Sequence, residues 1–129
     1  MTVRCLARVS LVWLLGCGSP APEEPPTHTS GGESAAPTHG AEVFAVYVVV
    51  ADPGAAALEE AAAPLREQAL HVSVGELGCD EGAAEALGAA PEAHAVSVTF
   101  DTREDADAFA ATLSEPPVGI ARVTVRCAD

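Results

Sequence analysis

The residues of this chain that could do chemistry are four cysteines, four histidines and a group of closely spaced acids. The cysteines are Cys5, Cys17, Cys79 and Cys127. No two of them are separated by only two residues, so the CxxC pattern of thiol redox enzymes is missing. The cysteines therefore predict a covalent attachment or a disulfide, and not a redox reaction.

The closely spaced acids are Asp101, Glu104, Asp105 and Asp107, whose oxygens would suit a calcium loop. The bend-forming glycine and the terminal bidentate glutamate of an EF-hand are missing from this stretch. Acidic side chains in the first turn of a helix stabilise its dipole, and we assign these residues that role.

The histidines and the one candidate phosphate loop offer no catalytic pattern. His28 and His39 are isolated in a proline-rich segment, and we place His71 and His94 at the surface or edge of a sheet. The turn at residues 52–55, Asp-Pro-Gly-Ala, lacks the glycines and the lysine of a phosphate loop. We therefore expect no enzyme, no metal site and no cofactor.

The charge of the chain excludes one class of partner. The formal net charge is −13, and the six basic residues are all arginine. Without residues 1–16, the 19 acids stand against four arginines, which gives −15. Such a field repels phosphate backbones, so we expect no binding to nucleic acid.

Residues 1–16 have a short basic start followed by an apolar stretch that is too short to span a bilayer. This pattern is typical of a secretory signal. Its ending, Leu14-Leu15-Gly16-Cys17, resembles the lipobox of bacterial lipoproteins. The resemblance implies cleavage before Cys17 and acylation of its thiol and of the new N-terminus.

The resemblance also implies a location, which is the cell envelope, with the lipid bilayer as a partner through acylated Cys17. More than one acyl chain is needed for stable anchoring, and this modification supplies three. An aspartate after the cysteine tends to retain Gram-negative lipoproteins at the inner membrane, and this chain has Gly18 there. In a Gram-negative host we expect the outer membrane, on its periplasmic or surface side.

Residues 17–41 follow as the lipidated cysteine and a spacer. Positions 18–41 are rich in Pro, Ser, Thr, Gly and Glu and contain no Leu, Ile, Val or aromatic residue. Such a segment has nothing to bury, so we expect it to be disordered. A spacer of this length averages roughly 25 to 30 Å from end to end.

Residues 42–129 form the predicted domain, with four strands and two long helices. A β-branched run at 43–51 predicts a central strand, and alternating apolar residues predict strands at 70–75, 94–101 and 121–127. Apolar stripes predict helices from Ala55 to Ala69 and after Thr102, and a short helix is expected at 80–87. Pro64 should kink or restart the first helix, and Thr102 with Asp105 is similar to a capping box.

The order of these elements predicts an α+β fold. Three of the four strands alternate, so we expect one face of the sheet to be open to water. This favours a ferredoxin-like α/β plait, with two βαβ units and a short extra helix between strands 2 and 3. A small parallel βαβ sheet is the alternative, because residues 76–93 are long enough for a crossover.

Cys79 and Cys127 remain once Cys5 leaves with the signal and Cys17 carries lipid. In an oxidising compartment two such cysteines are usually paired. The two strand ends that carry them lie at opposite edges of a plait, roughly 14 Å apart, whereas a disulfide needs Cα atoms within about 7 Å. Pairing and the simplest plait are therefore in conflict, and free thiols stay an alternative.

The predicted open face carries a candidate interaction surface. Ala45, Tyr47 and Val49 lie on one side of the first strand and would form an apolar stripe. We expect a non-enzymatic module that binds an envelope protein or forms a homodimer through this stripe. The alternative is a sensor or accessory domain that binds a small ligand or a cation, as the negative charge would allow.

Overall fold

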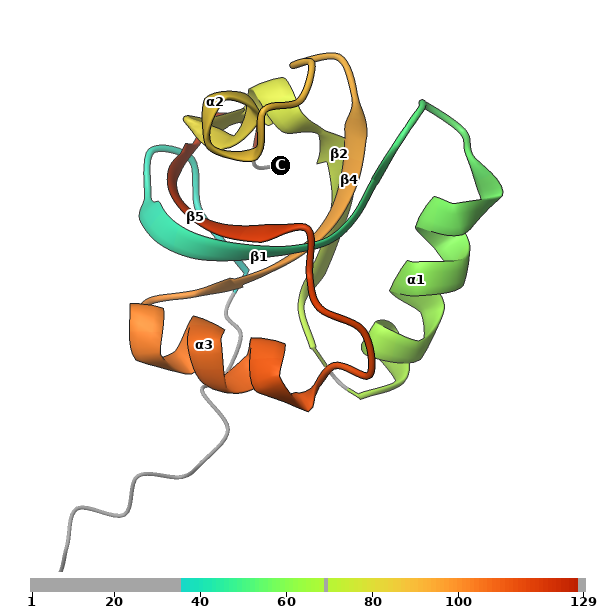
Figure 1. Cartoon of the computed structure of the whole chain (residues 1–129). Coiled ribbons are helices and arrows are strands. Elements are labelled where there is room, and N and C mark those ends of the chain that lie inside the picture. The colour runs from blue at the N-terminus through green and yellow to red at the C-terminus, as the bar shows by residue number, and fades with distance from the viewer. Residues whose placement is uncertain (1–35, 69, 128–129) are drawn as a thin grey trace, which may run out of the picture.

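The computed structural model describes residues 36–68 and 70–127. The predicted signal segment, Cys17 and most of the predicted spacer lie outside these ranges. Figure 1 shows a curled sheet with helices on both sides. The elements in chain order are β1 (Glu42–Ala51), α1 (Ala56–Glu67), β2 (Val72–Glu76), the 3-10 turn η1 (Leu77–Cys79), β3 (Asp80–Glu81), α2 (Ala83–Leu87), β4 (His94–Phe100), α3 (Arg103–Thr112) and β5 (Gly119–Val125).

The five strands form one sheet in the order β2-β4-β1-β5-β3, and every neighbouring pair is antiparallel. β2 and β3 are its two edges, yet only Leu77–Cys79 separate them in the chain. In a flat sheet these edges would be four strand spacings apart, or about 19 Å. The link from Glu76 to Asp80 reaches only about 14 Å when fully extended. The sheet must therefore curl until its edges approach each other.

This architecture corrects the predicted fold. The four-stranded ferredoxin-like plait is wrong, because the sheet has a fifth strand, β3, and curls so that its second face is enclosed. The parallel βαβ alternative is wrong because no pair in the sheet is parallel. Both predictions treated residues 76–93 as a connection, although Asp80–Glu81 of this segment pair with Val125 and Thr124 of β5.

The convex face of the sheet is covered by α1 and α3 (Figure 1). The apolar stripes of both helices are buried there, and α1 continues through Pro64 without a break. The rings of Phe100 on β4 and Phe109 on α3 lie 5.3 Å apart. α3 begins as predicted, with the Thr102 hydroxyl accepting a hydrogen bond from the Asp105 backbone N–H at 3.1 Å.

The concave face of the sheet is enclosed by η1 and α2, which contribute Leu77 and Ala83 to a second apolar cluster. We predicted that this face would be open to water. Ser97 and Thr99 of β4, whose side chains alternate with the apolar side chains of the convex face, are only 4% and 5% exposed. The polar half of the alternation therefore lies inside the protein.

Candidate functional site

The edge strand β3 is fixed against β5 by a covalent bond and an ion pair. Cys79 and Cys127 form a disulfide with a Cα–Cα distance of 5.0 Å. The Arg126 backbone N–H donates to the Cys79 carbonyl at 2.8 Å, and the Arg126 Nε donates to Glu81 Oε2 at 2.6 Å. The conflict between pairing and topology is resolved because Cys79 immediately precedes β3, which lies beside β5.

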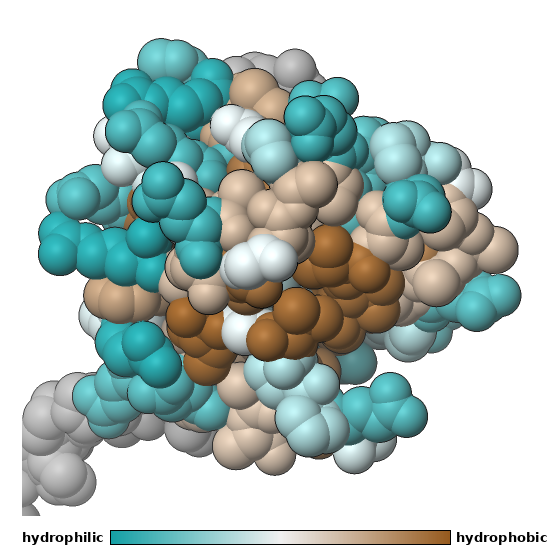
Figure 2. Space-filling model, turned by 45° about the horizontal axis from the view of Figure 1, so that its top comes forward, coloured by the Kyte–Doolittle hydropathy of each residue, from teal (hydrophilic) through white to brown (hydrophobic). Residues whose placement is uncertain are grey.

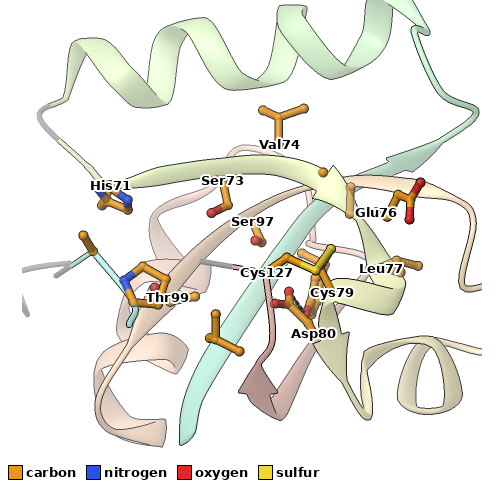
Figure 3. A pocket seen from close by; sticks show the side chains of 16 residues that line it. His71, Ser73, Val74, Glu76, Leu77, Cys79, Asp80, Ser97, Thr99 and Cys127 are labelled. Carbon is orange, nitrogen blue, oxygen red and sulfur yellow. Dashed lines mark hydrogen bonds between the residues drawn. A yellow bond between two sulfur atoms is a disulfide. The ribbon is translucent and has the colours of Figure 1, made fainter. Parts of the chain in front are cut away.

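A cavity of about 360 Å³ opens on the concave face, where the edges of the curled sheet approach each other. Figure 3 shows Ser73 of β2, Ser97 of β4 and Asp80 of β3 around it, with the disulfide at its wall. Ala36 and Pro37, the first described residues before β1, also line it. The polar side chains that line the cavity are Tyr47, His71, Ser73, Glu76, Asp80, Ser97 and Thr99.

The register of the sheet places three of these polar side chains in a row. Ser97 is paired with Tyr47 of β1 on one side and with Ser73 of β2 on the other. Residues paired directly across antiparallel strands point to the same face. Two hydroxymethyl groups and a phenol therefore share one level of the cavity wall.

Tyr47 connects this row to β3. Its hydroxyl donates a hydrogen bond to Asp80 Oδ2 at 2.7 Å. Burial raises the pKa of the Asp80 carboxyl, and the hydrogen bond from Tyr47 opposes this rise. Burial also raises the pKa of Tyr47, and the hydrogen bond and negative charge of Asp80 act in the same direction. Tyr47 is therefore a neutral donor at physiological pH.

The arginines of the described domain pair with carboxylates other than Asp80. Their partners are Glu59 for Arg66, Asp107 for Arg103, Glu42 for Arg122 and Glu81 for Arg126. The side chains in these pairs are well exposed, so each pair contributes little to stability. Because these arginines are paired elsewhere, none of them neutralises the Asp80 carboxylate at the cavity.

The predicted interaction surface is corrected by the structure. Tyr47 and Ala45 are 1% and 0% exposed and belong to the enclosed cluster of the concave face. A β-bulge between Tyr47 and Val49 shifts the alternation, and Val49 packs with the cluster under the helices. The three residues therefore do not form one exposed stripe.

The described residues contain neither a metal-binding cluster nor a membrane-spanning helix. No cluster of three or more His, Cys, Asp or Glu side chains in residues 36–68 and 70–127 is arranged to hold a metal ion. Within the same ranges, no helix has the length and apolar character needed to cross a membrane. Comparison with protein-family models, curated proteins and solved structures finds no match to this chain.

Sequence reasoning missed the cavity, although part of its signal was present. The inward positions of β4 carry Ala95, Ser97 and Thr99, which are small and uncharged, whereas the outward positions of β5 carry arginine at 122. Small hydroxyl residues without charges fit a crowded polar interior better than a solvated face. Asp80 gave no such signal, because its strand is only two residues long.

Proposed function

We propose that this protein is a lipid-anchored module of the cell envelope that binds a small polar ligand in the cavity of its curled sheet. The observation that carries the proposal is that the buried residues Tyr47, Ser97 and Thr99 and the partly buried Asp80 bring hydroxyl groups and a carboxylate to the wall of one cavity. Burying polar groups costs free energy unless they find partners. An interior that only stabilised the fold would be better filled by apolar side chains.

Binding fits this site better than catalysis. A general base or nucleophile needs a proton affinity matched to its task. The pKa of Tyr47 is instead raised by burial and by Asp80, which makes its phenol harder to ionise. Its donation of a hydrogen bond to Asp80 orients both groups, as a preformed binding site requires.

Nuclear magnetic resonance on the full-length chain in neutral detergent micelles tests this proposal. Titration with a mixture of small polar metabolites should shift the amide resonances of Ser73, Ser97 and Asp80 first. Ser97→Leu fills the cavity and should abolish these shifts, whereas Ser114→Leu, at an exposed position, should preserve them. Shifts spread evenly over the surface, or equal responses of the two variants, would refute the proposal.

A second candidate function is association through an open strand edge, which replaces the stripe proposed from the sequence. β5 pairs with β1 from Glu42 to Tyr47, while β1 continues to Ala51. On that side of Val48–Ala51 no strand is paired within the described residues. An unpaired strand edge of this kind can accept a strand from another chain.

Apolar side chains accompany this open edge. Val48, Val49 and Val50 are only partly buried, and Val118, whose N–H donates to the Tyr47 carbonyl, is 52% exposed. Figure 2 shows a contiguous hydrophobic patch near the middle of the face seen when the top of Figure 1 is turned forward. A second copy could pair antiparallel along the same edge, or an envelope protein could add its own strand.

Sedimentation velocity of the full-length chain in detergent separates these possibilities from a monomer. Val118→Glu should dissociate a dimer that uses this edge. Val74→Glu is the matched control, because Val74 is similarly exposed but lies on β2 at the other edge. Loss of the dimer with Val74→Glu alone would assign the contact to β2 instead.

A further inference from the structure

Asp80 presents a carboxylate to the cavity from a rigid position. It lies between the disulfide at Cys79 and the ion pair that Glu81 makes with Arg126. Figure 3 shows its oxygens at the cavity wall beside the disulfide. Since both flanking residues are tied to the chain after β5, this carboxylate cannot move far from the cavity.

None of the ion pairs found among the described residues involves this carboxylate. Its hydrogen bond comes from the neutral Tyr47 hydroxyl, and the arginines of the domain are paired elsewhere. The sequence contains no lysine. A charge that is partly removed from water without a counter-ion costs free energy, and a bound cation would offset that cost.

The cavity wall around Asp80 carries hydroxyl groups that can accept hydrogen bonds. The hydroxyl oxygens of Ser73, Ser97 and Thr99 line the same cavity. An ammonium group has N–H donors that need several acceptors. Leu77 and Ala95 add apolar wall for a short hydrocarbon part.

We infer that the ligand of this cavity is a small organic cation, such as a protonated amine, held by the Asp80 carboxylate and the hydroxyls of the sheet. This inference rests on the proposed function of the cavity. An anionic ligand would meet the carboxylates of Asp80 and Glu76, and among the described residues that line the site there is no arginine or lysine, His71 being the one basic side chain. A metal ion fits less well, because Asp80 is not part of a metal-ligating cluster within the described residues.

The test compares three ligands of similar shape and different charge. Cyclohexylammonium, cyclohexanol and cyclohexanecarboxylate are each titrated into the isotopically labelled full-length chain in neutral detergent micelles at physiological salt. We expect the ammonium to shift the cavity amides with an affinity about tenfold or more above that of the alcohol, which is the usual effect of a charge-assisted hydrogen bond. The carboxylate should not bind.

Two variants separate a specific contact from general attraction to an acidic protein. Asp80→Asn and Glu85→Gln each remove one negative charge, but only Asp80 lines this cavity, and Glu85 is an exposed residue of α2. We expect Asp80→Asn to abolish the preference for the ammonium and Glu85→Gln to keep it. The comparison of the three ligands on the unaltered chain does not depend on the folding of either variant.

Each other outcome is decisive. Equal affinities for the ammonium and the alcohol would overturn the inference of a cationic ligand, while the cavity would stay a binding site. An equal loss of ammonium affinity in the two variants, or preferred binding of cyclohexanecarboxylate, would lead to the same conclusion. If none of the three ligands shifts a cavity amide, the inference fails, and if the metabolite mixture also has no effect, the proposed function fails with it.

Discussion

Removal of the disulfide is the perturbation whose effect can be calculated most directly. Cys79 and Cys127 are separated by 48 positions in the chain. In the chain-entropy model, closing a loop of that length lowers the entropy of the unfolded chain by about 14 cal/mol/K, or about 4 kcal/mol at 25 °C. Small domains are stable by only about 5 to 15 kcal/mol, so the double variant Cys79→Ala/Cys127→Ala should lose a large share of its stability.

The position of the bond adds a local effect to this global one. β3 has two residues, and its sheet contacts are with β5 alone. Without the disulfide, β3 is held to β5 by the two paired residues and the Arg126–Glu81 ion pair, whose side chains are about half exposed. We therefore expect the cavity wall at Asp80 to open before the rest of the sheet unfolds.

Urea unfolding followed by far-ultraviolet circular dichroism measures the global effect. With a slope of about 1 to 2 kcal/mol/M for a domain of this size, the midpoint should fall by about 2 to 4 M. Reduction of the unaltered chain should give the same shift, and Cys5→Ala should give none. A double variant with an unchanged midpoint would refute the argument that this cross-link limits the unfolded chain.

Three further predictions concern single residues. Asp80→Asn should raise the melting temperature at pH 7. Burial holds the pKa of the folded Asp80 carboxyl above its unfolded value of about 3.9. The contribution of this carboxyl to stability therefore falls as the pH rises from the unfolded pKa through the folded pKa. Thermal unfolding at pH 7 and pH 3 checks this, and the gain should vanish at the lower pH. Phe109→Ala removes a ring packed on Phe100 from a residue that is only 9% exposed, and it should cost about 3 kcal/mol or more in urea unfolding; a cost below about 1 kcal/mol would contradict the packing of α3. Cys17→Ala should release the protein from the membrane fraction, as judged by fractionation and by the loss of acyl mass, and a variant that stays membrane-bound would rule out the lipid anchor.

The local elements could be predicted from the sequence because their signals are local. The apolar stripe of α1, with Leu58, Ala62 and Leu65 buried, follows the helical period, and the structure confirms it. The cap at Thr102 depends on residues three positions apart. The predicted strands at 94–101 and 121–127 agree within two residues at each end with β4 and β5.

The curl and the cavity could not be predicted because they depend on contacts between distant segments. Alternation in β4 shows that Ser97 and Thr99 point away from Val96 and Val98, but not whether water or protein lies on that side. A helix was expected to begin at Asp80, whereas α2 begins at Ala83. Gly82, with φ of 98°, separates β3 from α2, and this glycine was the available sign of a break.

The place of β5 in the sheet determines when the protein can fold. β5 is the last strand of the described residues, yet it lies between β1 and β3, and Glu42 is paired with Thr124. Until residues 119–127 have been synthesised, one side of β1 has no neighbour and Cys79 has no partner sulfur. Long-range strand pairing of this kind is slow, and incomplete sheets are prone to aggregate. We therefore expect a chain that lacks residues 119–125 to be prone to aggregation.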